Sequence, residues 1–347
     1  MINVLIVDDS AFVREVLTKI ISEDKELHVV ASVPDPYKAV EVLNSEKIDV
    51  ITLDLEMPRM DGLTFLEKLM SQKPMPVVVC SSIAEEGSDN AIKALELGAV
   101  EVITKPKFGL KDFFTEEKER LHESIKSASK TNIGVLKSSL KHLPKNQIKK
   151  SSSHLLSQTT NKVIAIGAST GGTIALKEIL SKLPKTCTGI VITQHMPEGF
   201  TKSFSNSLNS ECEIDVRESE DDDKILIGQA IIAMGNTHLK VERSGAYYRC
   251  KISNEPHVNR HRPSVDVMFE SIAQSVGKNA LGILLTGMGK DGALGLKAIK
   301  DAGGITIAQN ETSCVVYGMP KAAVDIGAAH YILNLDEIVQ KIIEFHD

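Results

Sequence analysis

The sequence predicts two α/β domains joined by a linker, and three features indicate this fold class. In residues 1–124, short β-branched runs alternate with amphipathic segments, and the same alternation returns in residues 162–347. Between them, residues 125–161 are rich in Ser, Asn and Gln and carry seven lysines but no acidic residue, which is typical of a linker. Strands that alternate with helices predict parallel sheets, so we expect two α/β domains.

The first domain is expected to contain five strands, each followed by a helix. The apolar runs that predict these strands are residues 4–7, 29–33, 50–53, 77–80 and 102–104. Helical patterns such as 11–21 and 91–97 lie between them. Five such units predict a (βα)5 domain with one parallel sheet.

The second domain is expected to be a doubly wound, mostly parallel sheet with a small hairpin. Its expected strands are residues 163–166, 190–193, 281–285 and 305–308, and a helical pattern follows each of them. Two further runs flank Ser244-Gly245 and predict the hairpin, 239–242 and 247–252.

Composition argues against several classes of protein. The chain has 347 residues, 42% hydrophobic and 25% charged, close to a globular average. No apolar stretch approaches the roughly 18 residues that cross a bilayer, so we expect no membrane insertion. The N-terminus lacks the basic region of a signal peptide, and we expect a cytoplasmic protein. Five widely spaced cysteines without a C-x-x-C pattern indicate neither a disulfide framework nor a zinc site.

Charge is distributed unevenly along the chain. Residues 1–124 carry 14 basic and 24 acidic side chains, and residues 162–347 carry 19 and 22. The lysines of residues 125–161 could bind nucleic acid or an anionic membrane, since clustered lysines attract phosphates. The run contains no aromatic residue and no arginine. A solvated linker is therefore the simpler interpretation, and we expect no nucleic-acid partner.

Polar side chains follow four of the expected strands of the first domain. Asp8 and Asp9 close the first strand, Asp54 the third, Ser81 the fourth and Lys105 the fifth. The carboxyl ends of parallel strands converge on one edge of a sheet. Three carboxylates at that edge require a cation, and an all-oxygen ligand set suits Mg²⁺. The alternative is that these residues only cap the following helices, but five converging positions favour a phosphoryl site.

Residues 1–124 resemble the receiver domain of two-component response regulators, which has a flavodoxin-like fold. The matching motifs are Val7-Asp8-Asp9-Ser10, Asp54-Leu55-Glu56-Met57-Pro58-Arg59-Met60-Asp61-Gly62, Ser81 and Thr104-Lys105-Pro106. The resemblance implies that a histidine kinase phosphorylates Asp54 and that Ser81 and Lys105 contact the phosphate. The implied Mg²⁺ ligands are Asp8, Asp9, Asp54 and the backbone carbonyl of Glu56. Val102 departs from the family, many members of which have a switching aromatic residue there.

A second set of residues indicates acyl transfer. Ser169 lies in Gly167-Ala168-Ser169-Thr170-Gly171-Gly172, between an expected strand and a helix, and G-x-S-x-G in such a turn is a nucleophile pattern. Alone, the turn could equally cradle a phosphate or allow close packing. His195 and Asp291 follow later strands, so they should share one sheet edge with Ser169. There His195 could take the Ser169 proton while Asp291 fixes the tautomer, although singly they could be structural. The order Ser, His, Asp disfavours the α/β-hydrolase fold.

The whole chain resembles the chemotaxis protein-glutamate methylesterase and glutamine deamidase family. The motifs are the Ser169 turn, Gln194-His195-Met196, His261-Arg262-Pro263-Ser264-Val265-Asp266, Leu285-Thr286-Gly287-Met288-Gly289-Lys290-Asp291-Gly292 and Val315-Val316-Tyr317-Gly318-Met319-Pro320. The resemblance implies a Ser169-His195-Asp291 triad, without a cofactor, that demethylates γ-glutamyl methyl esters of chemoreceptors and deamidates glutamines. It also implies activation by phosphorylation of the receiver. Our candidates for the oxyanion hole are the Thr170 and Met288 amides.

Three further segments have open interpretations. Met234-Gly235-Asn236 departs from the Pro-Gly-Gly common in the family, which leaves that loop uncertain. His257, His261 and Arg262 could orient substrate, or Pro263-Ser264 could simply start a helix with Ser264 as its cap. The acidic run 218–223 lacks the spacing of an EF-hand and is expected to be a solvated loop rather than a cation site.

Two other functions are weighed against the esterase. A receiver with a DNA-binding output would be a transcription regulator, but residues 162–347 are net acidic and contain no recognisable recognition-helix module. A dinucleotide-binding oxidoreductase would use the glycine-rich turn for pyrophosphate. Its G-x-G-x-x-G spacing is absent, and no ribose-binding acid follows about 20 residues later. A gel shift and a nucleotide titration distinguish these functions from the esterase.

Overall fold

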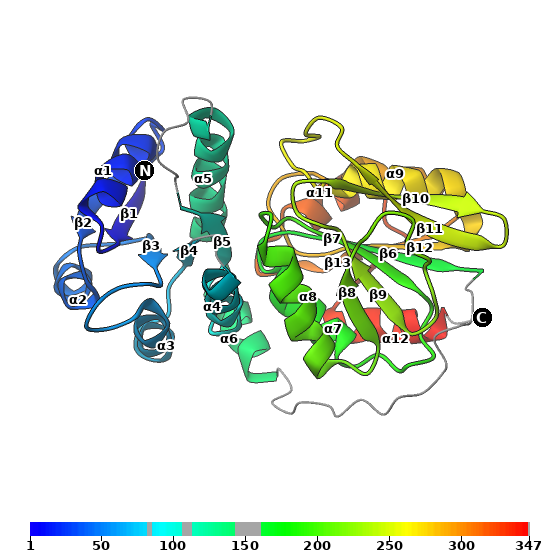
Figure 1. Ribbon diagram of the computed structural model, residues 1–347, viewed down its shortest axis with the longest axis horizontal. Helices are drawn as coiled ribbons and strands as arrows, with labels where there is room; N and C mark the ends of the chain where they lie inside the picture. The colour runs from blue at the N-terminus through cyan, green and yellow to red at the C-terminus, as the bar shows by residue number, and fades with distance from the viewer. Residues whose placement is uncertain (82–84, 106–112, 143–160, 346–347) are drawn as a thin grey trace. The chain divides into compact units, whose positions relative to one another are not determined.

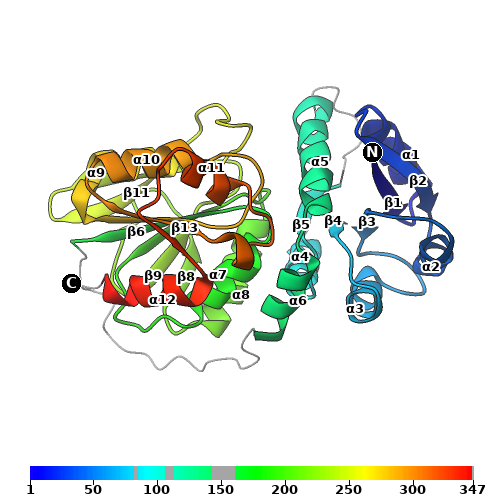
Figure 2. The same ribbon diagram turned by 180° about the vertical axis from the view of Figure 1, so that it is seen from behind.

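The computed structural model describes residues 1–81, 85–105, 113–142 and 161–345 (Figures 1 and 2). The chain divides into two compact units, Met1–Leu140 and Lys141–Asp347. Each is built around a parallel sheet, so the predicted two-domain α/β fold class is confirmed. Within the described ranges, no helix is both long and apolar enough to cross a membrane.

The first unit contains a five-stranded parallel sheet in the order β2-β1-β3-β4-β5. The strands are β1 (Ile2–Val7), β2 (Leu27–Val33), β3 (Val50–Asp54), β4 (Val77–Ser81) and β5 (Glu101–Thr104). The helices are α1 (Ala11–Ser22), α2 (Pro36–Ser45), α3 (Gly62–Gln72), α4 (Glu85–Glu96), α5 (Phe113–Ser129) and α6 (Ile133–His142). All five predicted strands are therefore present.

The interpretation of residues 125–142 as linker is wrong. The last turns of α5 and the whole of α6 occupy this stretch, and the side chains of Ile125, Ala128 and Leu136 are fully buried. Its lysines are not all solvated either, because Lys126 Nζ lies 2.8 Å from Asp24 Oδ2. A few apolar residues at helical spacing are enough to anchor these helices, although polar residues dominate the composition. The remainder of the predicted linker, 143–160, lies outside the described residues.

The second unit contains a seven-stranded parallel sheet in the order β14-β13-β12-β6-β7-β9-β8 and a separate hairpin, β10-β11. The strands are β6 (Val163–Ala168), β7 (Ile190–Gln194), β8 (Asp215–Glu218), β9 (Gln229–Ile232), β10 (His238–Ser244), β11 (Tyr247–Ser253), β12 (Ala280–Leu284), β13 (Ile305–Gln309) and β14 (Tyr331–Leu333). The helices are α7 (Gly172–Leu180), α8 (Phe200–Glu211), α9 (Val265–Ser275), α10 (Ala293–Asp301), α11 (Met319–Asp325) and α12 (Leu335–Glu344).

Helices cover both faces of this sheet, as the predicted doubly wound fold requires. In both views α7 and α12 lie on one face, and α9, α10 and α11 lie on the other (Figures 1 and 2). The inward side of α9 belongs to the core through Val265, Met268, Phe269 and Ile272. The predicted hairpin is present, whereas β8, β9 and β14 were not predicted.

Three central strands of the second unit bring the predicted site residues to one edge. β12, β6 and β7 are neighbours in that order. Their register pairs Leu284 with Gly167 and Ala168 with Gln194. The loops that follow these strands therefore start at the same level of the sheet, where parallel α/β sheets place their ligands.

Candidate active site and acidic cluster

In the first unit, three carboxylates converge at the carboxyl ends of β1 and β3. One oxygen of each of Asp8, Asp9 and Asp54 lies within 4.8 Å of the others. Lys105 Nζ lies 2.6 Å from Asp54 Oδ2 and 3.2 Å from Asp8 Oδ2. The structure thus brings together four of the residues predicted for the phosphoryl site.

The cluster has more negative charge than its single lysine compensates. Burial raises the pKa of Asp54 to about 6 and also raises the pKa of Asp8, even though Lys105 acts in the opposite direction. Burial alone would lower the pKa of Lys105, but the two carboxylates raise it. Among the described side chains, Lys105 is the one partner that we find for Asp8 Oδ2 and Asp54 Oδ2. Buried carboxylate oxygens in this state fit a hard divalent cation such as Mg²⁺.

The neighbouring loops keep Asp54 at the strand end. Glu56 N donates to Asp54 Oδ1 at 3.1 Å, and Gly62 passes so close that a Cβ there would lie 2.2 Å from the Asp54 carbonyl oxygen. Ser81 is buried at the end of β4, and its carbonyl accepts from Lys105 N at 2.9 Å. Val102, at the position where many receiver domains have an aromatic residue, is buried in β5. Pro106 of the matched motif lies outside the described residues.

In the second unit, Ser169 lies in a tight turn between β6 and α7. Ser169 N donates to Thr286 O at 3.0 Å, which ties the turn to the loop after β12. Gly171 has a φ of 76°, a left-handed conformation that favours glycine. A Cβ on Gly167 would lie 2.2 Å from Val265 Cγ1, so this glycine allows α9 to approach the strand. The glycines thus satisfy backbone and packing requirements around Ser169.

His195 is held beside Ser169 by backbone and amide hydrogen bonds. His195 N donates to Ala168 O at 3.1 Å. The side chain of Gln194 donates from Nε2 to Ser169 O and to His195 O, both at 3.0 Å. Sequence reasoning quoted Gln194 within a motif but assigned it no role. Its amide links the serine and histidine segments.

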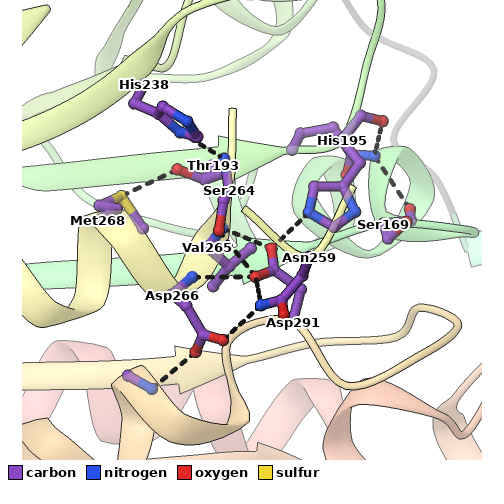
Figure 3. A network of polar contacts seen from close by, with 12 residues as sticks. Ser169, Thr193, His195, His238, Asn259, Ser264, Val265, Asp266, Met268 and Asp291 are labelled. Carbon is purple, nitrogen blue, oxygen red and sulfur yellow. Dashed lines mark hydrogen bonds and ion pairs between the residues drawn. The ribbon is translucent and has the colours of Figure 1, made fainter. Parts of the chain in front are cut away.

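A buried hydrogen bond joins His195 to Asp291. His195 Nε2 lies 2.8 Å from Asp291 Oδ2 (Figure 3). An ionised carboxylate only accepts hydrogen bonds, so Nε2 carries a hydrogen, and in the neutral form of the ring Nδ1 has the lone pair. Nδ1 is buried and has no hydrogen-bond partner among the described residues. The expected hydrogen bond from Ser169 to this nitrogen is thus not formed.

Asp291 accepts five hydrogen bonds and is 2% exposed. Its donors are His195 Nε2 and Val265 N to Oδ2, and Asn259 Nδ2, Ser264 Oγ and Asp266 N to Oδ1. Burial would raise the pKa of Asp291, but the hydrogen bond and charge of His195 and the amide donors hold it well below its usual range. Two of these donors are the first amides of α9, where a helix favours an anion.

The residues with open roles occupy the rim of this cluster. The His261 ring stacks on His195, with ring centroids 3.7 Å apart and an interplanar angle of 13°. Arg262 donates to Asn236 Oδ1 at 2.7 Å from one guanidinium nitrogen, and Asn236 has the left-handed φ of 62°. Ser264 starts α9 but does not cap it with its side chain, because its hydroxyl donates to Asp291 instead. His257 is an exposed loop residue between β11 and α9.

The two oxyanion-hole candidates adjoin Ser169. Thr170 follows it, and Thr286 Oγ1 donates to the Thr170 carbonyl at 2.9 Å. A Cβ on Gly287 would lie 2.7 Å from Ser169 Cβ, so the backbone that leads into Met288 packs directly on the serine. For Met288 N, we find no acceptor in the described part of the chain. Thr170 and the segment that leads into Met288 are therefore both adjacent to Ser169.

The acidic run 218–223 is engaged in ion pairs. Asp221 Oδ2 lies 2.7 Å from Lys251 Nζ, and Asp222 Oδ2 lies 2.5 Å from Arg249 Nη1. Asp223 pairs with Arg217. Basic side chains of β11 and β8 thus compensate the charge of these three aspartates.

The structure combines a (βα)5 domain that has an acidic cluster with a second α/β domain in which Ser169, His195 and Asp291 lie at one sheet edge. Residues 164–342 match the family model described as CheB methylesterase. Residues 4–113 match the model described as response regulator receiver domain. The chain belongs to the CheB methylesterase family and combines its methylesterase domain with a receiver domain.

Individual relatives agree with this assignment. A Pseudomonas syringae pv. tomato protein named protein-glutamate methylesterase/protein-glutamine glutaminase 2 is 51% identical, with 99% of this chain and 98% of that protein covered. A Shewanella oneidensis protein with the same name, numbered 3, is 48% identical, and 99% of each chain is covered. The Thermotoga maritima CheB methylesterase catalytic domain superposes with a TM-score of 0.52 and 38% identity, covering 54% of this chain and 99% of that one. The predicted enzyme class is confirmed.

The position of Asp291 predicts that its removal affects stability as well as activity. Asp291→Ala leaves the Ser264 hydroxyl and the first amides of α9 without their acceptor. We therefore expect the free energy of unfolding at pH 7 to fall by about 3 kcal/mol, against less than about 1 kcal/mol for Ser169→Ala. Because the folded-state pKa of Asp291 is lowered, this contribution is present above about pH 4 and is lost as the pH falls further. Denaturant unfolding at pH 7 and pH 3.5 measures the difference, and equal stability of both variants at pH 7 contradicts it.

Proposed function

We propose that Ser169, His195 and Asp291 form a catalytic triad that hydrolyses γ-glutamyl methyl esters on chemoreceptors. The observation that carries this proposal is the 2.8 Å contact between His195 Nε2 and Asp291 Oδ2, which leaves His195 Nδ1 as a buried base next to the Ser169 turn. The printed names of the relatives support glutamate methyl esters as the substrate class.

The proposed reaction proceeds through an acyl-enzyme. Ser169 Oγ attacks the ester carbonyl while His195 Nδ1 takes its proton, and Asp291 stabilises the imidazolium that forms. The Thr170 and Met288 amides stabilise the oxyanion of the tetrahedral intermediate. The C–O bond to the methoxy group then breaks, and the proton on His195 leaves with methanol. Water, deprotonated by the same imidazole, hydrolyses the acyl-enzyme to glutamate and frees Ser169.

The same groups serve for deamidation of glutamine. The substrate is then an amide, and His195 must protonate a poorer leaving group, which departs as ammonia. Glutamine and glutamyl methyl ester differ only in this leaving group, so one site accommodates both. The relatives named as glutaminases support this second activity.

For the receiver, we propose that a histidine kinase of chemotaxis transfers a phosphoryl group to Asp54. Asp8, Asp9, Asp54 and the Glu56 carbonyl would hold Mg²⁺, which supplies positive charge for the incoming phosphoryl group. Lys105 is within 2.6 Å of Asp54 and Ser81 ends the adjacent strand, so both are suited to contact the phosphate. The proposal is supported by the cluster of three carboxylates beside a single lysine.

We further propose that the unphosphorylated receiver inhibits the esterase and that phosphorylation of Asp54 relieves this inhibition. A shift from a 99:1 population in favour of the inhibited state to 99:1 in favour of the active state requires about 5.5 kcal/mol of differential stabilisation. A partial shift requires less. New charge at Asp54 that draws on Ser81 and Lys105 is a source of such a bias.

Replacing the nucleophile should abolish ester hydrolysis. We expect Ser169→Ala to reduce kcat by up to roughly 10⁶-fold and to leave the fold intact, because no second nucleophile is proposed. Methanol release from methylated receptor membranes measures the effect. Ser181→Ala, the same change at the end of α7, is the control and should retain full activity. Near-normal methanol release by Ser169→Ala would refute the triad.

Phosphorylation should require both Asp54 and a divalent cation. With a small-molecule phosphodonor, we expect labelling of the full chain in Mg²⁺ and none after chelation, because the carboxylates would otherwise repel the donor. Asp54→Asn should remove the label, whereas Asp35→Asn, at the cap of α2, should not. Addition of Mg²⁺ alone should raise the melting temperature of the wild type. An Asp54→Asn variant that is still labelled would show that another residue is the acceptor.

Removal of the receiver should relieve inhibition. A fragment that begins near Asn161 should release methanol without a phosphodonor, and faster than the unphosphorylated full chain at equal concentration on the same membranes. Phosphorylation of the full chain should reduce this difference. A folded fragment that is no faster than the unphosphorylated chain rules out inhibition by the receiver.

A further inference from the structure

The backbone amides at the start of α9 and of α10 each donate to a buried carboxylate that comes from the other segment. Asp266, in the first turn of α9, accepts a hydrogen bond at Oδ1 from Gly295 N of α10 at 2.7 Å. Asp291, just before α10, accepts at Oδ2 from Val265 N of α9 at 2.7 Å. Neither helix receives a side-chain cap from its own N-cap residue. Each helix start is therefore stabilised by a carboxylate from the other segment.

This arrangement places the carboxylates of Asp266 and Asp291 next to each other. Asp266 N is 3.4 Å from Asp291 Oδ1, and the two side chains are 4% and 2% exposed. Burial, together with the charge of Asp291, raises the pKa of Asp266 to about 6. Repulsion between the two carboxylates would disturb the orientation of Asp291 toward His195 unless a donor lies between them.

Asn259 supplies that donor. Its Nδ2 donates to Asp266 Oδ2 and to Asp291 Oδ1, both at 2.7 Å (Figure 3). An amide NH₂ has two hydrogens, one for each carboxylate. No role for Asn259 was predicted from the sequence.

A tight turn presents this side chain. Val258 and His261 form a backbone bridge with hydrogen bonds of 3.1 and 2.9 Å, and the two residues between them have φ values of 51° and 69°. Such a two-residue turn requires positive φ at both positions, which asparagine tolerates better than most residues. The same turn carries His261, whose ring stacks on His195.

We propose that Asn259 is a positioning residue of the esterase, which bridges the carboxylates of Asp266 and Asp291 and so keeps Asp291 aimed at His195. The inference rests on the proposed function of His195 and Asp291 in ester hydrolysis. Asp266 is the fixed end of the bridge, because the Gly295 amide holds its other oxygen. Asn259 acts through Asp291.

Asn259→Gly tests the bridge without straining the turn, since glycine adopts positive φ freely. We expect kcat for methanol release to fall about 10- to 100-fold with KM changed less than about twofold, as for loss of a hydrogen bond to a charged group. The acid limb of the pH profile of kcat/KM should move to higher pH, because Asp291 loses a donor that helps to hold its pKa low. The ionisable groups in contact with the His195 ring are Asp291 and His261, and Glu270 is a further charge that acts on Asp266. Asn259→Asp, which replaces the donor by a third carboxylate, should lose more.

A double-mutant cycle tests whether the two ends act as one unit. Asp266→Asn presents an amide to the Asn259 amide, donor against donor, and breaks the same bridge. The double variant Asn259→Gly/Asp266→Asn should therefore be no slower than the slower single variant. Asn334→Ala, which removes the cap of α12, is the matched control and should keep the wild-type kcat and pH profile. Thermal unfolding of every variant shows whether it is folded. If Asp266→Asn does not fold, the kcat and pH profile of Asn259→Gly alone decide the test.

Additive losses in the cycle, or a wild-type kcat and pH profile in Asn259→Gly, would overturn the inference. Ser169→Ala in the same assay separates this outcome from failure of the proposed function. If Ser169→Ala is inactive while Asn259→Gly is normal, only the bridge is wrong. If Ser169→Ala remains active, the triad itself is wrong.

Discussion

A carboxylate buried in a protein must be compensated by hydrogen bonds or charge, and at Asp291 the compensation comes from several elements at once. The first amides of α9, the Ser264 hydroxyl and the Asn259 amide all converge on its two oxygens. These donors leave Oδ2 directed at His195 at 2.8 Å. The close approach of α9 to β6 requires glycine at 167, because a Cβ there would meet Val265. The glycine-rich turn, the start of α9 and the histidine are therefore parts of a single arrangement.

The two halves of the chain use the same residue type in opposite ways. Asp291 has an excess of donors, and its pKa lies well below the usual range, so it remains a charged partner for His195. Asp54 shares one lysine with Asp8, and burial raises its pKa to about 6. A carboxylate with too little compensation is suited to receive a cation and a phosphoryl group. The environment of each carboxylate, rather than its identity, accounts for the difference in the proposed roles.

Much of the fold could be predicted from sequence because hydrophobic periodicity reports burial directly. The strands that carry the site residues are long apolar runs, and residues at their carboxyl ends must meet. The short strand β14 was not predicted, because three residues are too few to show an alternating pattern. Helix α6 was not predicted, because its few apolar positions stand among lysines and serines and resemble a loop. The role of Asn259 could not be predicted, because a turn asparagine is common and its carboxylate partners come from distant segments. Ser264 was assigned a possible cap, although its hydroxyl binds Asp291 instead.

In the proposed triad, Asp291 fixes the neutral His195 ring with its hydrogen on Nε2 and a lone pair on Nδ1. Nitrogen-15 NMR of the full chain, with the His195 signals assigned by comparison with a His195 variant, measures this state directly. At pH 8 we expect a protonated Nε2 and an unprotonated Nδ1, and Asp291→Asn should disturb this preference. A resonance pattern with the hydrogen on Nδ1 in the wild type would contradict the account.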